Sequence, residues 1–392
     1  MKKFMVIIAV IAMVGAFTAT SMAAEWNFYG SSRMTTVWYD KSKEVVGTNF
    51  DDQDTAWTSQ TNARIGAKVK ASDAVSGRFE MGMSSNNGHK YGDRTTHPEL
   101  SNINSDTVWL RLMYGEYNFG SGSLLVGQDY TPTTAILSAN IGVLPSVIAS
   151  QGLTPVNDGE GNALQVGAFY ISRQPQIKLK FGGLQLAFID PKQTTIGAYT
   201  DSDTTLPRIE ASYKFKTDMF SITPYAGYNT TEMSDPTNDN SITVSSYVVG
   251  ASGDVNFGPM YVKAQVFWSQ NPDNYGRSNV GLYDGAILNA AGTDVEDSSC
   301  YGGQLIAGFK LSDLLTFEAG YSYDHNEVDL NTGFTGENDP SAWYVNATIT
   351  LAPGVYIIPE VGYFDFGDLE LPTGDIDQGD ATYYGAKWQI NF

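Results

Sequence analysis

The chain has 392 residues, and its 43 acidic and 23 basic side chains give a net charge of −20. Such an acidic chain is not expected to bind nucleic acid, because phosphate backbones require basic surfaces. A single cysteine, Cys300, excludes a disulfide framework and a thiolate metal site.

Residues 1–24 have the pattern of a secretory signal peptide. Two lysines precede an apolar run over residues 4–17, and small residues end the segment at Ala23 and Ala24. The apolar run is shorter than the roughly 20 residues of a spanning helix. We therefore predict cleavage after Ala23 or Ala24, export from the cytoplasm, and one mature domain over residues 25–392.

From residue 25 onward, apolar and polar residues alternate in many short segments, which predicts β-strands. Turn-forming residues separate these segments. We expect 16 strands, at residues 26–39, 57–71, 77–85, 106–118, 123–130, 168–181, 184–190, 207–217, 219–230, 241–256, 260–270, 299–311, 315–328, 341–352, 355–367 and 380–392.

The connections between these strands alternate strictly between short and long. The short ones are tight turns such as "GSG" and "PG". The long ones are at residues 40–56, 86–105, 131–165, 191–206, 231–240, 271–298, 329–340 and 368–379. This alternation is typical of outer-membrane barrels, which have short periplasmic turns and long extracellular loops.

The two faces of the predicted strands differ in the solvent that they require. Ile65 and Val69 share an apolar face, whereas Arg64 and Lys68 lie on the opposite face of the same strand. Ionised side chains in mid-strand require water, so the polar face lines a water-filled space and the apolar face contacts lipid. In lipid every backbone group must be paired, so strands cross only as a closed sheet. The sequence therefore predicts an all-β fold: a transmembrane, antiparallel, up-and-down β-barrel of about 16 strands that ends on a lipid-facing Phe392.

The order of three motifs resembles the general diffusion porins of Gram-negative outer membranes. The motifs are "FYGSSRMTTVWYD", "SQTNARIGAKVKASDAVSGRFEMGMSSNN" and "RLMYGEYNFGSGSLLVGQDY", with the terminal phenylalanine. The resemblance implies a homotrimer in the outer membrane, surrounded by lipid and lipopolysaccharide. It further implies a water-filled channel for passive diffusion of ions and small hydrophilic solutes.

The resemblance also implies that the third long loop, residues 131–165, folds into the lumen and narrows it. It places an arginine cluster opposite acids of this loop, and the matching positions here are Arg64, Arg111 and Arg173, with Asp158 and Glu160 as the loop acids. Arg111 matches only after a one-residue shift in its strand. Arg33 and Lys68 face the lumen by strand parity. Few acids among several cations favour anions locally, whereas the acidic outer loops favour cations, so the sign of the ion preference stays open.

No enzyme, cofactor or metal site is expected. The three histidines are His89, His97 and His325, and none shares a strand face or a helical spacing with a suitable nucleophile or ligand. Two alternatives to the general channel remain. One is a solute-specific porin, selective for sugars or anions, and the other is a plugged barrel that acts as an adhesin or an outer-membrane enzyme.

Overall fold

The structure is a computed structural model. It describes residues 24–45, 48–60, 62–84, 107–135, 137, 166–204, 206–238, 240–277, 283–330, 334–370 and 374–392. Over these residues no helix has the length and hydropathy needed to cross a membrane.

Most of the described chain is β-strand, as the alternating pattern predicts. The strands of the first half are β1 Glu25–Val45, β2 Thr48–Ser59, β3 Ala63–Lys70, β4 Val75–Ser84, β5 Thr107–Asn118, β6 Ser123–Tyr130, β7 Arg173–Phe181, β8 Leu184–Ile189, β9 Asp201–Asp203, β10 Arg208–Tyr213 and β11 Phe215–Lys216. The second half contains β12 Phe220–Ser234, β13 Ser241–Phe257, β14 Met260–Gln270, α2 Pro272–Tyr275, β15 Ile287–Leu288, β16 Val295–Glu296, β17 Ser298–Lys310, β18 Leu315–Leu330, β19 Phe334–Asn338, β20 Ser341–Ala352, β21 Val355–Asp365, β22 Asp368–Leu369, β23 Ile376–Asp377 and β24 Asp380–Asn391.

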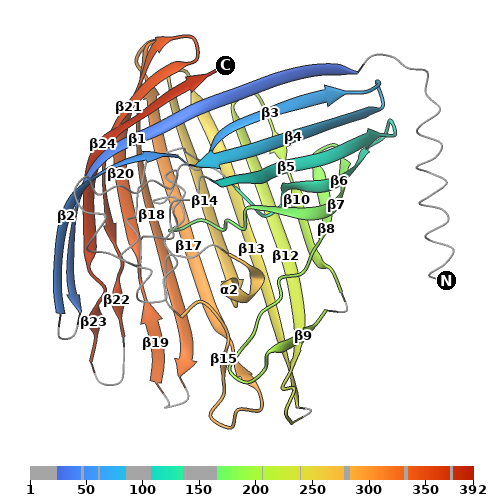
Figure 1. Ribbon diagram of the computed structural model, residues 1–392, viewed down its shortest axis with the longest axis vertical. Coiled ribbons are helices and arrows are strands. Elements are labelled where there is room, and N and C mark those ends of the chain that lie inside the picture. The colour runs from blue at the N-terminus through green and yellow to red at the C-terminus, as the bar shows by residue number, and fades with distance from the viewer. Residues whose placement is uncertain are drawn as a thin grey trace.

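These strands form a closed antiparallel barrel of 16 wall strands (Figure 1). The main sheet contains 20 strands because interruptions divide three wall strands, namely β2 with β3, β9 with β10 and β11, and β19 with β20. Each wall strand pairs with its neighbour along the chain, and β1 pairs with β24 over Ser31–Ser42 and Asp380–Asn391. This last pairing closes the sheet, so the predicted fold class is confirmed.

The side chains separate into two faces as their parity requires. Apolar side chains that point outward are strongly exposed, for example Trp57 and Phe28 at 66% and Phe392 at 72%. Polar and charged side chains of opposite parity are buried on the inner side, among them Glu80, Glu210 and Lys387. A soluble protein would expose the polar set and bury the apolar one. This inverted distribution fits a wall between lipid and a polar lumen.

The two ends of the barrel differ as predicted. The short strands of the long connections, β9, β15, β19, β22 and β23, lie at the lower end in Figure 1, whereas the C-terminus lies at the upper rim. The first hairpin is longer than expected, because β1 and β2 stay paired out to Val45 and Thr48 across most of the predicted connection 40–56.

The sixth wall strand is shorter than the predicted segment 168–181, since β7 begins only at Arg173. Ser172 has a φ of 66°, a left-handed conformation that an extended strand cannot contain. The residues before it leave the wall, and the side chains of Phe169 and Ile171 are buried in a cluster with Tyr275 inside the barrel. These residues therefore add apolar side chains to the interior of the barrel instead of lengthening the wall strand.

Candidate functional site

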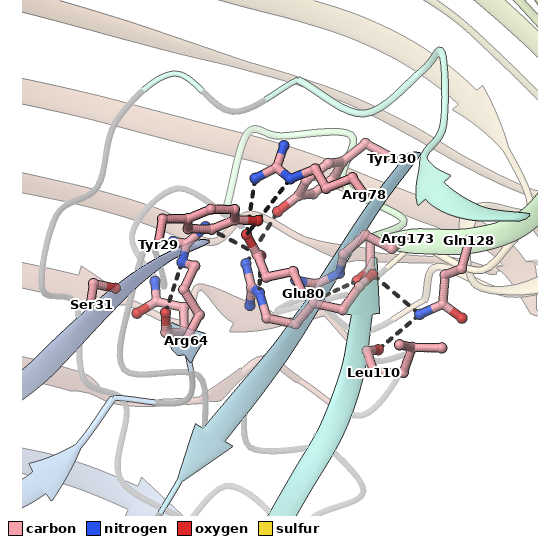
Figure 2. Close-up of polar contacts among 12 residues, drawn as sticks. Tyr29, Ser31, Arg64, Arg78, Glu80, Leu110, Gln128, Tyr130 and Arg173 are labelled. Carbon is pink, nitrogen blue, oxygen red and sulfur yellow. Dashed lines mark hydrogen bonds and ion pairs between the residues drawn. The ribbon is translucent and has the colours of Figure 1, made fainter. Parts of the chain in front are cut away.

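The carboxylate of Glu80 is the centre of a charged cluster on the inner wall (Figure 2). It is fully buried and lies 2.7 Å from Arg111 Nε, 3.0 Å from Arg78 Nη2 and 3.4 Å from Arg64 Nη1. The hydroxyl of Tyr29 donates to Glu80 Oε2 at 2.9 Å. Three guanidinium groups and one phenol thus share a single carboxylate, and charge-assisted bonds of this kind hold the side chains in fixed positions.

Strand register brings these side chains together from four wall strands. Tyr29 of β1 lies opposite Gly66 of β3, and Gly66 lies opposite Glu80 of β4. A Cβ atom at Gly66 would lie 2.8 Å from the Tyr29 hydroxyl oxygen. The glycine therefore provides the space in which the tyrosine ring reaches across β3 to the glutamate.

Arg111 points into the cluster because of a β-bulge. The register of β4 against β5 shifts between Glu80 and Met81, which pair with Leu112 and Leu110 and leave Arg111 as the extra residue. A bulge lets one strand carry one more residue than its partner and redirects a side chain. The bulge therefore moves Arg111 by one position out of the regular alternation of β5, so that its side chain faces Glu80.

Arg173 joins the cluster indirectly, through Tyr130. Its guanidinium lies 5.4 Å from the centre of the Tyr130 ring, within cation–π distance, and Arg111 Nη2 donates to the Tyr130 hydroxyl at 3.3 Å. Arg173 also donates to the hydroxyl of Ser172, the residue that turns the chain into β7. The three predicted arginines therefore lie in one connected group, and Figure 2 shows two of them, Arg64 and Arg173, around Glu80 and Tyr130.

The other predicted site residues are distributed differently. Arg33 is on the same face of β1 as Tyr29 and donates to Ser31, whose register partner is Arg64. Lys68 lies opposite Arg78 in the β3–β4 pair and is exposed to the lumen. Asp158 and Glu160 lie outside the described residues, so their predicted position opposite the arginines stays a prediction.

Glu80, Arg78 and Tyr130 are the members that the sequence reasoning did not single out. The sequence carries a signal for two of them. In "GRFEMG", Arg78 and Glu80 have the parity of the polar face, whereas Phe79 and Met81 have the parity of the outward face. Two opposite charges two residues apart on an inner strand face indicate an internal ion pair. Tyr130 carries no such signal, because it ends its strand.

Both described ends of the third long loop contact the inner wall on the far side of the barrel. The backbone N–H and the hydroxyl of Thr133 donate to Glu210 Oε2 at 3.0 and 2.9 Å, and Lys263 Nζ donates to the carbonyl of Leu137 at 2.7 Å. At the other end, Gln304 donates to the carbonyl of Val166 at 3.0 Å. These contacts hold the start and the end of the loop inside the lumen, while residues 138–165 lie outside the described chain.

The start of a second long connection, residues 271–277, also lies inside the barrel, although the sequence predicts the connection 271–298 only as an outer loop. Its helix α2 lies against β13 and β17 on the inside of the wall, and Tyr275 at its end donates to Glu210 Oε1 at 3.1 Å. Arg277 forms a fully buried ion pair with Asp324 at 2.6 Å and donates to the carbonyl of Ala168 at 2.8 Å. The buried ring of Tyr275 and the buried ion pair of Arg277 with Asp324 hold this segment inside the barrel and away from the water-exposed rim.

Among the described residues, no group of three or more histidine, cysteine or carboxylate side chains is placed to hold a metal ion.

Comparison with known proteins places the chain in one family. The sequence profile described as Gram-negative porin matches residues 9–369. No curated protein sequence matches the chain significantly.

Solved structures share its fold at low sequence identity. The outer membrane channel DcaP of Acinetobacter baumannii is 17% identical with a TM-score of 0.65, over 95% of this chain and 99% of that chain. The anion-selective porin from Comamonas acidovorans is 12% identical with a TM-score of 0.57, over 94% and 100%. OmpF of Salmonella typhi, in complex with daunomycin, is 13% identical with a TM-score of 0.52, over 93% and 97%.

Proposed function

The chain belongs to the Gram-negative porin family and forms an outer-membrane channel for passive diffusion, and we propose that the cluster around Glu80 is its charged constriction. The observation that carries the proposal is the convergence of Arg64, Arg78 and Arg111 on one buried carboxylate of the inner wall. The third loop, whose described ends are bound inside the lumen, forms the opposite side of this constriction.

The charge balance of the cluster favours anions. Arg64, Arg78, Arg111 and Arg173 contribute four positive charges, and Glu80 contributes one negative charge. Arg64 and Arg78 keep 22% and 29% of their side-chain surface exposed, so a permeating ion meets their positive charge. A ring of basic side chains in a narrow pore selects anions. The anion-selective porin from Comamonas acidovorans has the same fold.

The test is the reversal potential of the purified channel in a planar bilayer under a KCl gradient. Arg64→Ala removes one partly exposed cation while Arg78 and Arg111 still bind Glu80. We expect the reversal potential to move toward cation selectivity, by several-fold in the permeability ratio, since about 1 kcal/mol corresponds to roughly fivefold.

A matched control is Lys70→Ala, which removes a rim lysine that is 56% exposed and paired with Asp73. This variant should leave the reversal potential unchanged. An equal shift in the two variants, or none in Arg64→Ala, would show that the cluster is not the selective part of the pore.

The channel is further proposed to be a homotrimer that catalyses no reaction, with lipid and lipopolysaccharide around its outer face. One structure of the same fold, OmpT of Vibrio cholerae, has been obtained in a trimer form, at 13% identity and a TM-score of 0.52. The mass of the protein in mild detergent tests the assembly, and a monomer there would contradict it. Residues 1–24 are proposed to be removed as a signal peptide, which the N-terminal sequence of the mature protein would show.

A further inference from the structure

A second polar region of the lumen lies apart from the cluster around Glu80. It is a cavity of about 560 Å³ between the described start of the third loop, residues 131–135 with Leu137, and the inner faces of β6 to β14. This volume is within the range of small-molecule sites, roughly 300 to 1,000 Å³. Several of its residues adjoin the short turns of the barrel, so the cavity is on the periplasmic side of the loop.

Four lysines line the cavity, in a chain whose net charge is −20. Lys178 binds Asp129 at 2.8 Å and is almost fully buried, so it has a structural role. Lys180 pairs with Glu116 at 3.1 Å, and Lys263 lies 3.8 Å from Glu318. Neither of these glutamates lines the cavity, and in both pairs the lysine side chain is the more exposed partner. Lys180 Nζ also bonds the second oxygen of Glu116, and Lys263 Nζ donates to the carbonyl of Leu137.

Lys214 is the fourth lysine, and within the described residues its ammonium group has no ion-pair partner. Strand register places it near Lys180: Lys180 lies opposite Gln185, Gln185 lies opposite Ser212, and Lys214 follows on the same face. Two strand spacings and an offset of two residues along the strand, about 12 Å in all, separate the two Cα atoms. Flexible lysine stems that project into one cavity can converge on a single anion across this distance.

The adjoining part of the cavity wall, β12 and β13, has a different chemistry. Hydroxyl groups of Ser221, Thr223 and Ser252 line β12 and β13 there, together with the carboxylate of Asp254. Asp254 accepts a bond from Ser221 and one from Asn256, and it lies opposite Lys263 in the strand register. A carboxylate among hydroxyls and amides accepts hydrogen bonds from hydroxyl groups of a ligand, but it would repel a simple inorganic anion.

We infer that this cavity binds a monosaccharide that carries an acidic group. Lys180 and Lys214 bind the phosphate or carboxylate of the ligand, while Asp254 and the hydroxyl side chains bind its sugar hydroxyls. The inference deepens the proposed channel function and rests on it, because the ligand reaches the cavity through the lumen. The pore would then contain a site at which one class of solute is retained during passage.

The test is the block of single-channel current by glucose 6-phosphate and by glucuronate in a planar bilayer at constant KCl concentration. We expect a saturable reduction of current by at least one of the two, and the more effective one identifies the acidic group. Lys214→Gln should raise the half-blocking concentration about tenfold, as expected for the loss of one charge-assisted contact. Asp254→Asn should weaken the block of current by the sugar acid, but it should not weaken the small block of current by inorganic phosphate.

The control variant is Lys310→Gln, which neutralises a rim lysine that is 56% exposed and paired with Asp313, outside the cavity. The half-blocking concentration of each sugar acid should be the same for this variant as for the unmodified channel. Equal block by neutral glucose or by inorganic phosphate, no block by either sugar acid, or equal effects of Lys214→Gln and Lys310→Gln would each overturn the inference. The proposed constriction is tested separately, because the reversal potential of Arg64→Ala involves no sugar.

Discussion

At the scale of single residues, Glu80 is a buried carboxylate that several cationic side chains share. Its carboxylate has no solvent exposure and accepts bonds from three arginines and one tyrosine. Without this negative charge, three guanidinium groups would repel one another at close distance. The glutamate therefore permits a dense group of cations on the inner wall, and in the proposed constriction one buried side chain would link stability with ion preference.

The variant Glu80→Gln separates these two roles. It keeps the side-chain volume but removes the charge, so we expect the reversal potential to move toward stronger anion selectivity. We also expect a loss of about 3 kcal/mol in the free energy of unfolding, because removing one partner of a buried ion pair leaves uncompensated charges. Urea titration of the folded barrel in detergent measures the second effect.

Glu116→Gln provides the comparison for stability. Glu116 also faces the lumen, but it is 23% exposed and binds one lysine that is 29% exposed, so its loss should cost less than about 1 kcal/mol. A similar loss of stability in the two variants would contradict the structural role assigned to Glu80.

At the scale of elements, inward-folded loops depend on small residues in the wall that receives them. Tyr275, at the end of α2, packs against the inner face of β12 at Gly227, where a Cβ atom would collide with the tyrosine hydroxyl. This contact positions the hydroxyl for its bond to Glu210, which also binds Thr133 of the third loop. Glu210 thus connects two loops to the same point of the wall.

We expect Gly227→Ala to displace Tyr275 and to release the α2 segment from the wall. Overpacking of this kind costs about 1–3 kcal/mol. The released segment would change the width of the lumen, so single-channel conductance should differ from that of the unmodified channel, with faster proteolysis near α2.

The same substitution at Gly115 is the matched control, since a Cβ atom there meets no other atom within 4 Å. Gly115→Ala should leave both conductance and proteolysis unchanged. Unaltered behaviour of Gly227→Ala would show that the loop is not held by this contact.

At the scale of the whole molecule, the last residue contributes two hydrogen bonds to the closure of the barrel. The backbone N–H of Gly30 donates to the carbonyl of Phe392 at 2.7 Å, and the N–H of Phe392 donates to the carbonyl of Gly30 at 3.0 Å. These bonds complete the β1–β24 seam, which joins the two ends of a chain of 392 residues. In a barrel every strand depends on closure, because an open edge leaves unpaired backbone groups.

Deletion of Phe392 should lower the folded fraction after refolding into detergent, since two closing hydrogen bonds worth about 1 kcal/mol each are lost. Heat-dependent migration on a gel measures the folded fraction. Phe392→Ala keeps both backbone bonds and removes only an outward ring that is 72% exposed, so it should fold better than the deletion variant. Identical folding of the deletion variant and the unmodified chain would contradict the role of the seam.

The sequence by itself determined the barrel, its two faces and the alternation of its connections. These properties follow from local repetition: side chains alternate with a period of two, and ionised residues such as Arg64 identify the wet face wherever they occur in mid-strand. Periodicity needs no knowledge of distant contacts, which is why β6, β14 and β20 begin and end at the predicted residues.

Only the tertiary structure decided which lumen side chains meet. Glu80 and Arg111 are 31 residues apart, and a bulge in β5, invisible in the alternation, turns Arg111 toward Glu80. The inward course of α2 depends likewise on Gly227 and Glu210, residues of wall strands distant in sequence from Tyr275. Parity assigns a side chain to the lumen, but its partner there depends on register, bulges and the path of the loops, which are set by the closure of the whole barrel.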